Sequence, residues 1–245
     1  MAEKLKSILK RIHWSLPRRS IQGLILKAAF FAVAWFVLPW WLFLFVALYC
    51  YFVPLFRPGK LFIPFFCLMI LTVVRPPSFL LALVFGVIFY YLLLIKDLLI
   101  INRRFAYEIL VLTLSFFLIR DFFIGNSGFH ASVFLGAFWC AIMIGLLMRS
   151  MMRFFDTDVP GRDAVRVVVS WLVVLLSWQC ILIGLFLPLD FVYQSIIVFI
   201  AITFFCEFIA GHFWSDLSRE KIFVTASVFF ALLVILLASA PWGIT

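Results

Sequence analysis

Charged residues are scarce in this chain: Asp, Glu, Lys and Arg together make up 13% of its 245 residues, and only 11 residues are acidic. Apolar side chains make up 67%, and Phe alone occurs 33 times. A soluble domain carries roughly twice this share of charge and has no core large enough for so much hydrocarbon. The scarcity of charge therefore excludes a water-soluble enzyme or binding domain and predicts a polytopic membrane protein.

Cysteine is also sparse, and its spacing forms no recognisable site. The five cysteines fall within or near separate apolar runs, without a CxxC or Cys/His pair: Cys50, Cys67, Cys140, Cys180 and Cys206. Isolated cysteines in apolar sequence are typical of small buried residues. We therefore expect no disulfide framework, no zinc site and no cofactor.

Basic residues outnumber acidic ones by 20 to 11, which gives a formal net charge of +9. In a soluble protein this balance would suggest a nucleic-acid partner. Here the basic residues lie at the ends of apolar segments, where they face anionic lipid headgroups. We predict membrane lipids and protein partners within the bilayer, and no nucleic acid.

Residues 1–20 predict an amphipathic helix that lies in the membrane interface. Leu5, Ile8, Leu9 and Ile12 recur at spacings of three and four, and lysines occupy the other faces. This pattern is typical of interfacial helices. Pro17 then ends the helix.

Residues 21–245 predict one all-α transmembrane bundle of about nine spans. The expected spans are 21–38, 42–56, 61–74, 79–95, 105–119, 129–148, 167–187, 191–210 and 222–240. The first four have 14 to 18 residues, whereas a straight crossing needs about 20. Residues 21–95 therefore form either four full crossings in tilted or thinned geometry or two re-entrant hairpins, and we favour the crossings.

The basic residues also predict an orientation. A cytoplasmic amino terminus places 17 of the 20 basic residues on the cytoplasmic side and only Arg75 and Arg120 outside. The remaining one, Lys27, lies within the first span and is expected to extend its amine to the headgroups. This asymmetry predicts a cytoplasmic (cell inner) membrane protein with its carboxyl terminus outside.

The segment Gly125-Asn126-Ser127-Gly128 is similar to the GxSG motif of rhomboid intramembrane proteases. That resemblance implies a nucleophilic serine with a histidine base, for which Gly211-His212 is the later candidate. The predicted topology separates Ser127 from His212 by most of a ~30 Å hydrocarbon layer, so the two cannot react together. The segment also resembles the PSGH element of membrane lipid phosphatases, but the proline is absent and a residue intervenes before His130. We predict no catalytic residue.

Asp156, Asp158 and Asp163 form a DxD motif with a further acid on the predicted cytoplasmic side. Carboxylates at this spacing are typical of magnesium and pyrophosphate sites, and nearby arginines are candidate phosphate ligands. The alternative is an ordinary solvated loop in which the acids neutralise the arginines and Pro160-Gly161 makes the turn. We favour the loop.

Four polar residues in or near the spans are the candidate substrate-binding residues: Glu108, Gln179, Glu207 and His212. Polar groups in hydrocarbon are costly and often functional. They predict a polar cavity open to the inner leaflet, near Lys96 and Asp97. The alternative is that each carboxylate pairs with a nearby Lys or Arg at the interface.

Three functions remain open. A carrier or flippase for a lipid or small hydrophobic molecule fits the predicted inner-leaflet cavity and the paired short helices. A non-catalytic membrane-embedded subunit of a larger complex fits the Phe-rich sequence and the incomplete catalytic sets. A magnesium-dependent transferase acting on a lipid phosphate at the cytoplasmic face fits the DxD motif. We favour the carrier and do not predict an enzyme.

Overall fold

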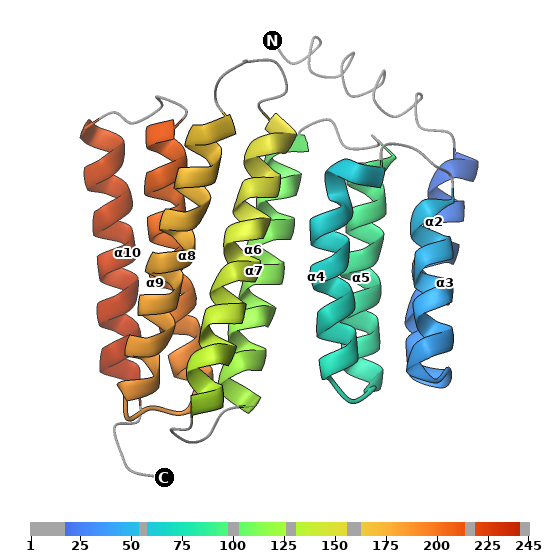
Figure 1. Cartoon of the computed structure of the whole chain (residues 1–245), viewed down its shortest axis with the longest axis horizontal. Helices are drawn as coiled ribbons and strands as arrows, with labels where there is room; N and C mark the ends of the chain where they lie inside the picture. The colour runs from blue at the N-terminus through green and yellow to red at the C-terminus, as the bar shows by residue number, and fades with distance from the viewer. Residues whose placement is uncertain are drawn as a thin grey trace, which may run out of the picture. The chain divides into compact units, whose positions relative to one another are not determined.

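The computed structural model describes residues 18–53, 58–97, 103–125, 131–155, 163–213 and 219–240. These residues form nine α-helices and one 3-10 helix (Figure 1), namely α2 (Arg18–Val37), α3 (Trp40–Phe52), η1 (Pro58–Leu61), α4 (Phe62–Val74), α5 (Phe79–Lys96), α6 (Arg103–Gly125), α7 (Ala131–Phe155), α8 (Asp163–Phe186), α9 (Phe191–Phe213) and α10 (Arg219–Ser239). The all-α fold class is therefore confirmed. The predicted interfacial helix falls on residues 1–17, which lie outside the described residues.

Five of these helices, α5, α7, α8, α9 and α10, are long and apolar enough to cross a membrane. Three shorter apolar helices, Ile21–Val37, Trp40–Phe52 and Phe62–Val74, belong to α2, α3 and α4. The remaining helix, α6, carries Glu108, Arg120 and Asp121 along its 23 residues. Helix length and hydropathy thus make the chain an integral membrane helical protein, and nine complete crossings stay a prediction.

Several helices extend past the ends that the sequence predicts. Helix α6 continues through Arg120 and Asp121 to Gly125, and α7 continues through Arg149 to Phe155. Helix α8 begins at Asp163 instead of Val167. The predicted ends were wrong because they were placed where charged residues end the apolar run. A helix can continue past that point, since arginine is a good helix former and its long side chain can reach polar surroundings.

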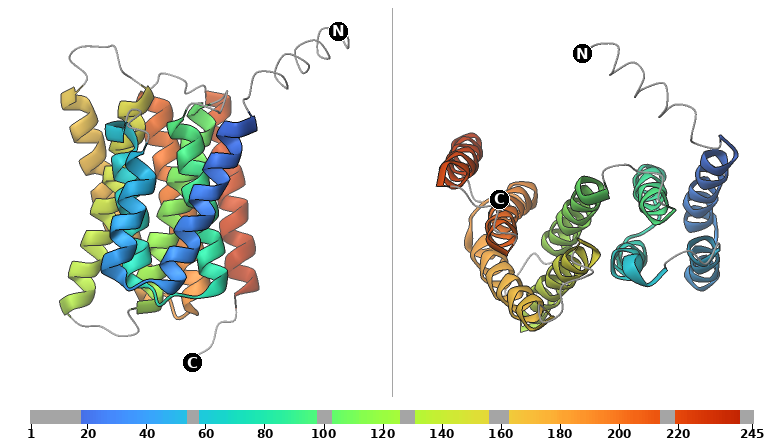
Figure 2. Two further views of the ribbon diagram at one scale, coloured as in Figure 1. Left: turned by 90° about the vertical axis from the view of Figure 1, so that its right-hand side faces the viewer. Right: turned by 90° about the horizontal axis from the view of Figure 1, so that it is seen from above.

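The chain divides into two compact units, Met1–Leu110 and Val111–Thr245, each described by itself below. In unit 1, α2 to α5 alternate in direction (Figure 1) and lie at four corners when seen along their axes (Figure 2). Proline ends or starts helices at the turns: Pro39 caps α3, and Pro76-Pro77 separates α4 from α5. Proline has no backbone N–H and is disfavoured inside a helix, which explains why the helices break at these positions.

Aromatic rings from all four helices fill the core of unit 1. Phe31 of α2 stacks on Phe89 of α5 with ring centroids 4.2 Å apart and meets Phe43 of α3 edge-on at 5.1 Å. Tyr51 of α3 stacks on Phe65 of α4 at 4.1 Å. All five side chains are buried, and offset ring pairs add stability beyond the buried area. Unit 1 is therefore a packed four-helix core.

In unit 2, α7 packs along α8, α8 along α9, and α9 along α10. Glycine allows α7 to lie close to α8 and α8 to lie close to α9. A Cβ on Gly145 of α7 would lie 3.0 Å from the backbone oxygen of Ser170 in α8, and one on Gly184 of α8 would lie 2.4 Å from the Val198 side chain of α9. Small residues are the usual means of close helix packing in membranes.

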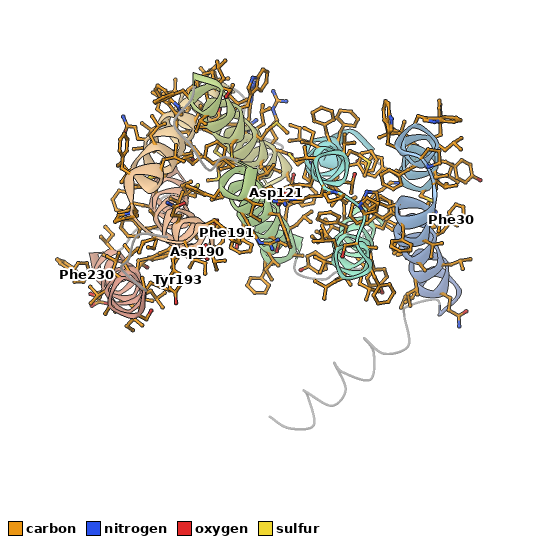
Figure 3. All side chains as sticks on the ribbon, turned by 90° about the horizontal axis from the view of Figure 1, so that it is seen from below. Phe30, Asp121, Asp190, Phe191, Tyr193 and Phe230 are labelled. Atoms are coloured by element: carbon orange, nitrogen blue, oxygen red, sulfur yellow. The ribbon has the colours of Figure 1, made fainter. Side chains whose placement is uncertain are left out.

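Large apolar side chains cover the outer surfaces of both units. Phe30 of α2 and Phe230 of α10 project away from the helices that carry them (Figure 3), and they are 53% and 69% exposed. Every residue of Ile222–Ser239 in α10 is half-buried or exposed. Such surfaces suit contact with lipid or with another membrane protein.

Candidate functional site

The carboxyl end of α3 exposes backbone carbonyls that the helix itself does not satisfy. Helix α3 ends at Phe52, and the amide of Val53 donates to the Tyr49 oxygen at 3.0 Å. Pro54 follows in the sequence and has no N–H to donate to the Cys50 oxygen. The last carbonyls of a helix also carry its negative partial charge. This end of α3 therefore attracts cations.

Two lysines from neighbouring helices bind this end, and we call them the lysine pair. Lys27 of α2 donates a hydrogen bond to the Val53 carbonyl, and Lys96 of α5 donates one to the Tyr51 carbonyl. The Lys96 amine also lies 5.0 Å from the centre of the Tyr51 ring, within cation–π range. Lys96 is only 2% exposed. The fold thus brings two cations from separate helices to one helix end.

Three ionisable groups, Lys27, Lys96 and Asp97, interact at this site. Lys96 is repelled by Lys27 and attracted by Asp97, the next residue in the chain. The Oδ1 atom of Asp97 is buried and has no hydrogen bond within the described part of the chain. Two ammonium groups and one carboxylate thus lie together next to apolar helices, and ionisable groups in such surroundings are candidates for a functional role.

The four predicted substrate-binding residues lie in different surroundings. Glu108 is half-buried in the second turn of α6 and belongs to unit 1. Gln179 of α8 and Glu207 of α9 belong to unit 2, and both side chains are exposed on its surface. His212 lies in the last turn of α9. The predicted common cavity stays a prediction, and the exposure of Gln179 and Glu207 does not support a pocket within unit 2.

The predicted magnesium site falls largely outside the described residues, where Asp156 and Asp158 are found. Asp163 is the first residue of α8. Within the described ranges, no group of three or more His, Cys, Asp or Glu side chains is placed to hold a metal ion. The DxD motif therefore stays a prediction, and Ser127 and His130 likewise lie outside the described residues.

At the end of unit 2 where α6 ends and α9 begins, two acids have different exposure. Asp121 of α6 is half-buried, whereas Asp190, at the start of α9, is exposed (Figure 3). The Asp190 backbone oxygen accepts the amide of Gln194 at 3.0 Å, so this residue begins the helix. The backbone of Asp190 thus accepts the first hydrogen bond of α9.

The partner of Lys27 did not follow from the sequence. Its amine was expected to reach the headgroups, which stays a prediction, and the structure shows that it donates a hydrogen bond to the Val53 carbonyl. The missed signal was Pro54, which predicts a helix end with unsatisfied carbonyls near this depth. Which helices would supply the donors could not be read from the sequence, because it does not show which helices are neighbours.

These features define the class of the molecule, an integral membrane helical protein with a cationic site at one helix end. No protein-family model, curated protein or solved structure matches the chain.

Proposed function

We propose that this protein is a carrier or flippase for a lipid or small hydrophobic molecule that carries an anionic group. The observation that supports the proposal is the lysine pair, Lys27 and Lys96, which gathers two cations at the end of α3. Ionisable residues within membrane segments are functional candidates by default. The anionic group is bound at the lysine pair while its hydrocarbon stays among apolar helices.

The setting of the lysine pair supports a binding role. The ammonium groups come from α2 and α5, so an anion between them would contact two helices of unit 1 at once. Lysine has three donors, and Lys27 and Lys96 each donate a hydrogen bond to a backbone carbonyl at the end of α3. A ligand that competes with these carbonyls would change the contacts between α2, α3 and α5. Binding would thereby be linked to rearrangement of unit 1, as transport requires.

The proposal further places the lysine pair on the cytoplasmic side of a cytoplasmic membrane. Within unit 1, η1 and the end of α5 lie at one end of the helices and the Arg75–Ser78 turn at the other (Figure 1). The first end carries Lys60, Lys96 and Asp97, and the second carries Arg75. The positive-inside rule therefore supports cytoplasmic exposure of the lysine pair.

Lipid movement in vesicles tests this function. The purified protein is reconstituted into vesicles containing fluorescently labelled phosphatidylglycerol, and dithionite reduces the label on outer-leaflet lipid. We expect the protein to move labelled lipid from the inner to the outer leaflet, where dithionite reduces it, so that more of the fluorescence is lost than in empty vesicles. Lys27→Gln should slow this about tenfold, since a hydrogen bond to a charged group contributes about 1.5–3 kcal/mol. Lys27→Arg keeps the charge and should retain most of the rate.

The matched control is Lys221→Gln in α10, which removes one positive charge from unit 2. It should leave the rate unchanged. A wild-type rate equal to that of empty vesicles would exclude phosphatidylglycerol transport, and equal rates for Lys27→Gln and wild type would remove the lysine pair from the proposal.

A second candidate, a non-catalytic membrane-embedded subunit, is favoured by the exposed polar groups of unit 2. Gln179 and Glu207 both lie exposed on apolar helices, and α10 buries little of its surface. A partner helix would satisfy such groups. A photo-crosslinking residue at position 179 should then capture one defined protein, and capture of lipid alone would contradict this function. The transferase alternative depends on Asp156 and Asp158, whose change to Asn should abolish any transfer.

A further inference from the structure

Helix α8 has one face on which side chains lie open along its whole length. Those that are exposed or half-buried recur at alternating spacings of three and four residues, and we call them the α8 stripe: Val165, Val168, Leu172, Leu175, Gln179, Leu182 and Phe186. Such spacings are the a and d positions of a heptad, with which parallel helices pack against each other. Six of the seven residues are apolar, and Gln179 occupies an a position.

Gln179 lies at a depth where lipid cannot satisfy its amide. It is seven residues before the end of α8 at Phe186, which is about 10 Å along the helix. In a hydrocarbon layer of ~30 Å this position is well inside the apolar region. Side chains of a helix tilt toward its amino terminus, so that of Gln179 leans toward the middle of the span and away from the nearer end. The amide is therefore directed away from the nearer headgroups.

The chain itself leaves this amide without a partner. The side chain of Gln179 is exposed, and within the described ranges it forms no hydrogen bond. An unpaired primary amide in hydrocarbon is costly. Polar side chains at such positions commonly pair with a polar group on a neighbouring transmembrane helix. The six apolar residues of the α8 stripe are stable against lipid, but Gln179 favours a second helix with a polar group at the same depth.

A second copy of the chain provides that group. Copies of one membrane protein share one orientation, so a two-fold axis along the membrane normal brings two α8 helices together in parallel. Residues near such an axis lie opposite their own counterparts, which places Gln179 against Gln179. The amide has both an N–H donor and a carbonyl acceptor. Each Gln179 can therefore donate a hydrogen bond to the other, and the α8 stripe is complementary to itself.

No charge on the α8 stripe opposes this contact. Arg166 is the only charged residue between positions 164 and 186, and its side chain is only 8% exposed. Two copies of the stripe would therefore meet without repulsion between like charges. A single polar residue at an a position also fixes the register of a helix pair. Gln179 is suited to this role because the other six residues are apolar.

We propose that the protein forms a homodimer in the membrane through the α8 stripe, with the Gln179 side chains of the two copies hydrogen-bonded to each other. The apolar residues of the stripe pack above and below this amide pair. The dimer does not depend on the transport proposal. Its partner is a second copy of this chain, whereas the second candidate function requires a different protein.

Counting of molecules in lipid vesicles measures dimerisation. The full-length protein, with one fluorophore per chain, is reconstituted into phosphatidylcholine vesicles at decreasing protein density, and the fluorophores of each complex are counted by stepwise photobleaching. Wild type should form dimers that dissociate on dilution. Gln179→Leu should raise the dissociation constant about fivefold to tenfold, as expected for lost hydrogen bonds between transmembrane helices. Gln179→Asn keeps the amide and should have a smaller effect.

Ser227→Leu in α10 is the matched control, because Ser227 is also an exposed polar residue on an apolar helix. It should leave the dissociation constant within about twofold. Monomers at every density, or equal dissociation constants for Gln179→Leu and wild type, would overturn the proposal. All these variants change exposed side chains, so the fold should be kept.

Disulfide cross-linking locates the interface. In a protein whose native cysteines are replaced by Ala, Leu172→Cys adds a thiol to the α8 stripe and Leu232→Cys adds one to α10, at native residues that are 45% and 44% exposed. In membranes of the expressing cells, copper phenanthroline should link two copies through Leu172→Cys and leave Leu232→Cys monomeric. Equal linkage at both positions would indicate random collision, and linkage of Leu172→Cys to a different protein would assign this face to an unlike subunit. Either result would contradict the homodimer.

Discussion

The amine of Lys96 donates a hydrogen bond to the backbone carbonyl of Tyr51 while lying 5.0 Å from the centre of the same residue's ring. One residue thus offers a carbonyl and an aromatic face to one cation. Both residues are buried at the level where α3 ends. The contact joins α5 to α3 in addition to any role in binding.

Replacement of Lys96 by Met should therefore lower the stability of unit 1. Met has a similar length but cannot donate a hydrogen bond, which leaves the Tyr51 carbonyl without this donor. The loss of a hydrogen bond that involves a charged group costs about 1.5–3 kcal/mol. Equilibrium unfolding in mixed micelles of dodecylmaltoside and dodecyl sulfate measures the free energy of unfolding. Lys96→Arg should lose less, and a Met variant as stable as wild type would show that the contact contributes nothing.

Loss of a hydrogen bond between neutral groups in unit 1 should lower the stability less than the Lys96 replacement does. The indole nitrogen of Trp35 in α2 donates to the Thr72 carbonyl of α4 at 2.9 Å, and both residues are buried. Trp35→Phe keeps an aromatic ring but removes the donor. We expect a loss of about 0.5–1.5 kcal/mol plus a packing term for the smaller ring. Thermal unfolding followed by circular dichroism should show a lowered midpoint, and an unchanged midpoint would contradict the contact.

Glycine substitution tests the close approach of α7 and α8. Gly145→Ala places a methyl group 2.3 Å from a Val174 methyl and 3.0 Å from the Ser170 oxygen, a backbone atom that cannot rotate away. The helices must separate, so we expect destabilisation of about 1–3 kcal/mol. Gly23→Ala in α2 is the control, since its Cβ would meet nothing within 4 Å. That change should be neutral or stabilising, because alanine favours helix by up to about 1 kcal/mol.

The same free-energy measurement serves both glycine variants. Equal effects of Gly145→Ala and Gly23→Ala would contradict the packing of α7 on α8.

Within the described residues, the positions of the helices followed from the sequence, because long apolar runs separated by Pro, Gly and charged residues allow little else in a membrane. The helix ends followed less well: α6 and α7 pass through Arg120 and Arg149. Contacts between helices did not follow at all. The amine of Lys27 donates a hydrogen bond to the carbonyl of Val53, 26 positions away in the sequence. This contact depends on the packing of α2 against α3, which the sequence does not show.

The candidate site shows the same division. The sequence identified Lys96 and Asp97 as part of a polar layer but grouped them with Glu207, which the structure places in the other unit with an exposed side chain. Hydropathy indicates the depth of a residue in the membrane. It does not show which side of a helix faces its neighbours, because these helices are apolar on nearly all sides. Gln179 was judged informative by its depth, whereas its exposure depends on the side of α8 on which it lies.

The four short segments between residues 21 and 95 can be tested as complete crossings. Helix α2 has 20 residues and spans about 30 Å, and η1 with α4 spans about 28 Å, at about 1.5 Å per α-helical and 2.0 Å per 3-10 residue. These lengths approach the ~30 Å hydrocarbon layer. We therefore expect the turn at Ser78 to reach the outside and Gly59 to face the cytoplasm.

Single cysteines at these two exposed positions decide between crossings and hairpins. The native cysteines, of which Cys50, Cys67 and Cys140 are buried, are first replaced by Ala. In intact cells a membrane-impermeant thiol reagent should label Ser78→Cys but not Gly59→Cys, which should react only after the membrane is opened. Re-entrant hairpins would place both turns of α2–α3 and α4–α5 inside the bilayer, so Ser78→Cys would stay unlabelled from outside. Labelling of Gly59→Cys alone in intact cells would instead reverse the orientation, and with it the cytoplasmic assignment of the lysine pair.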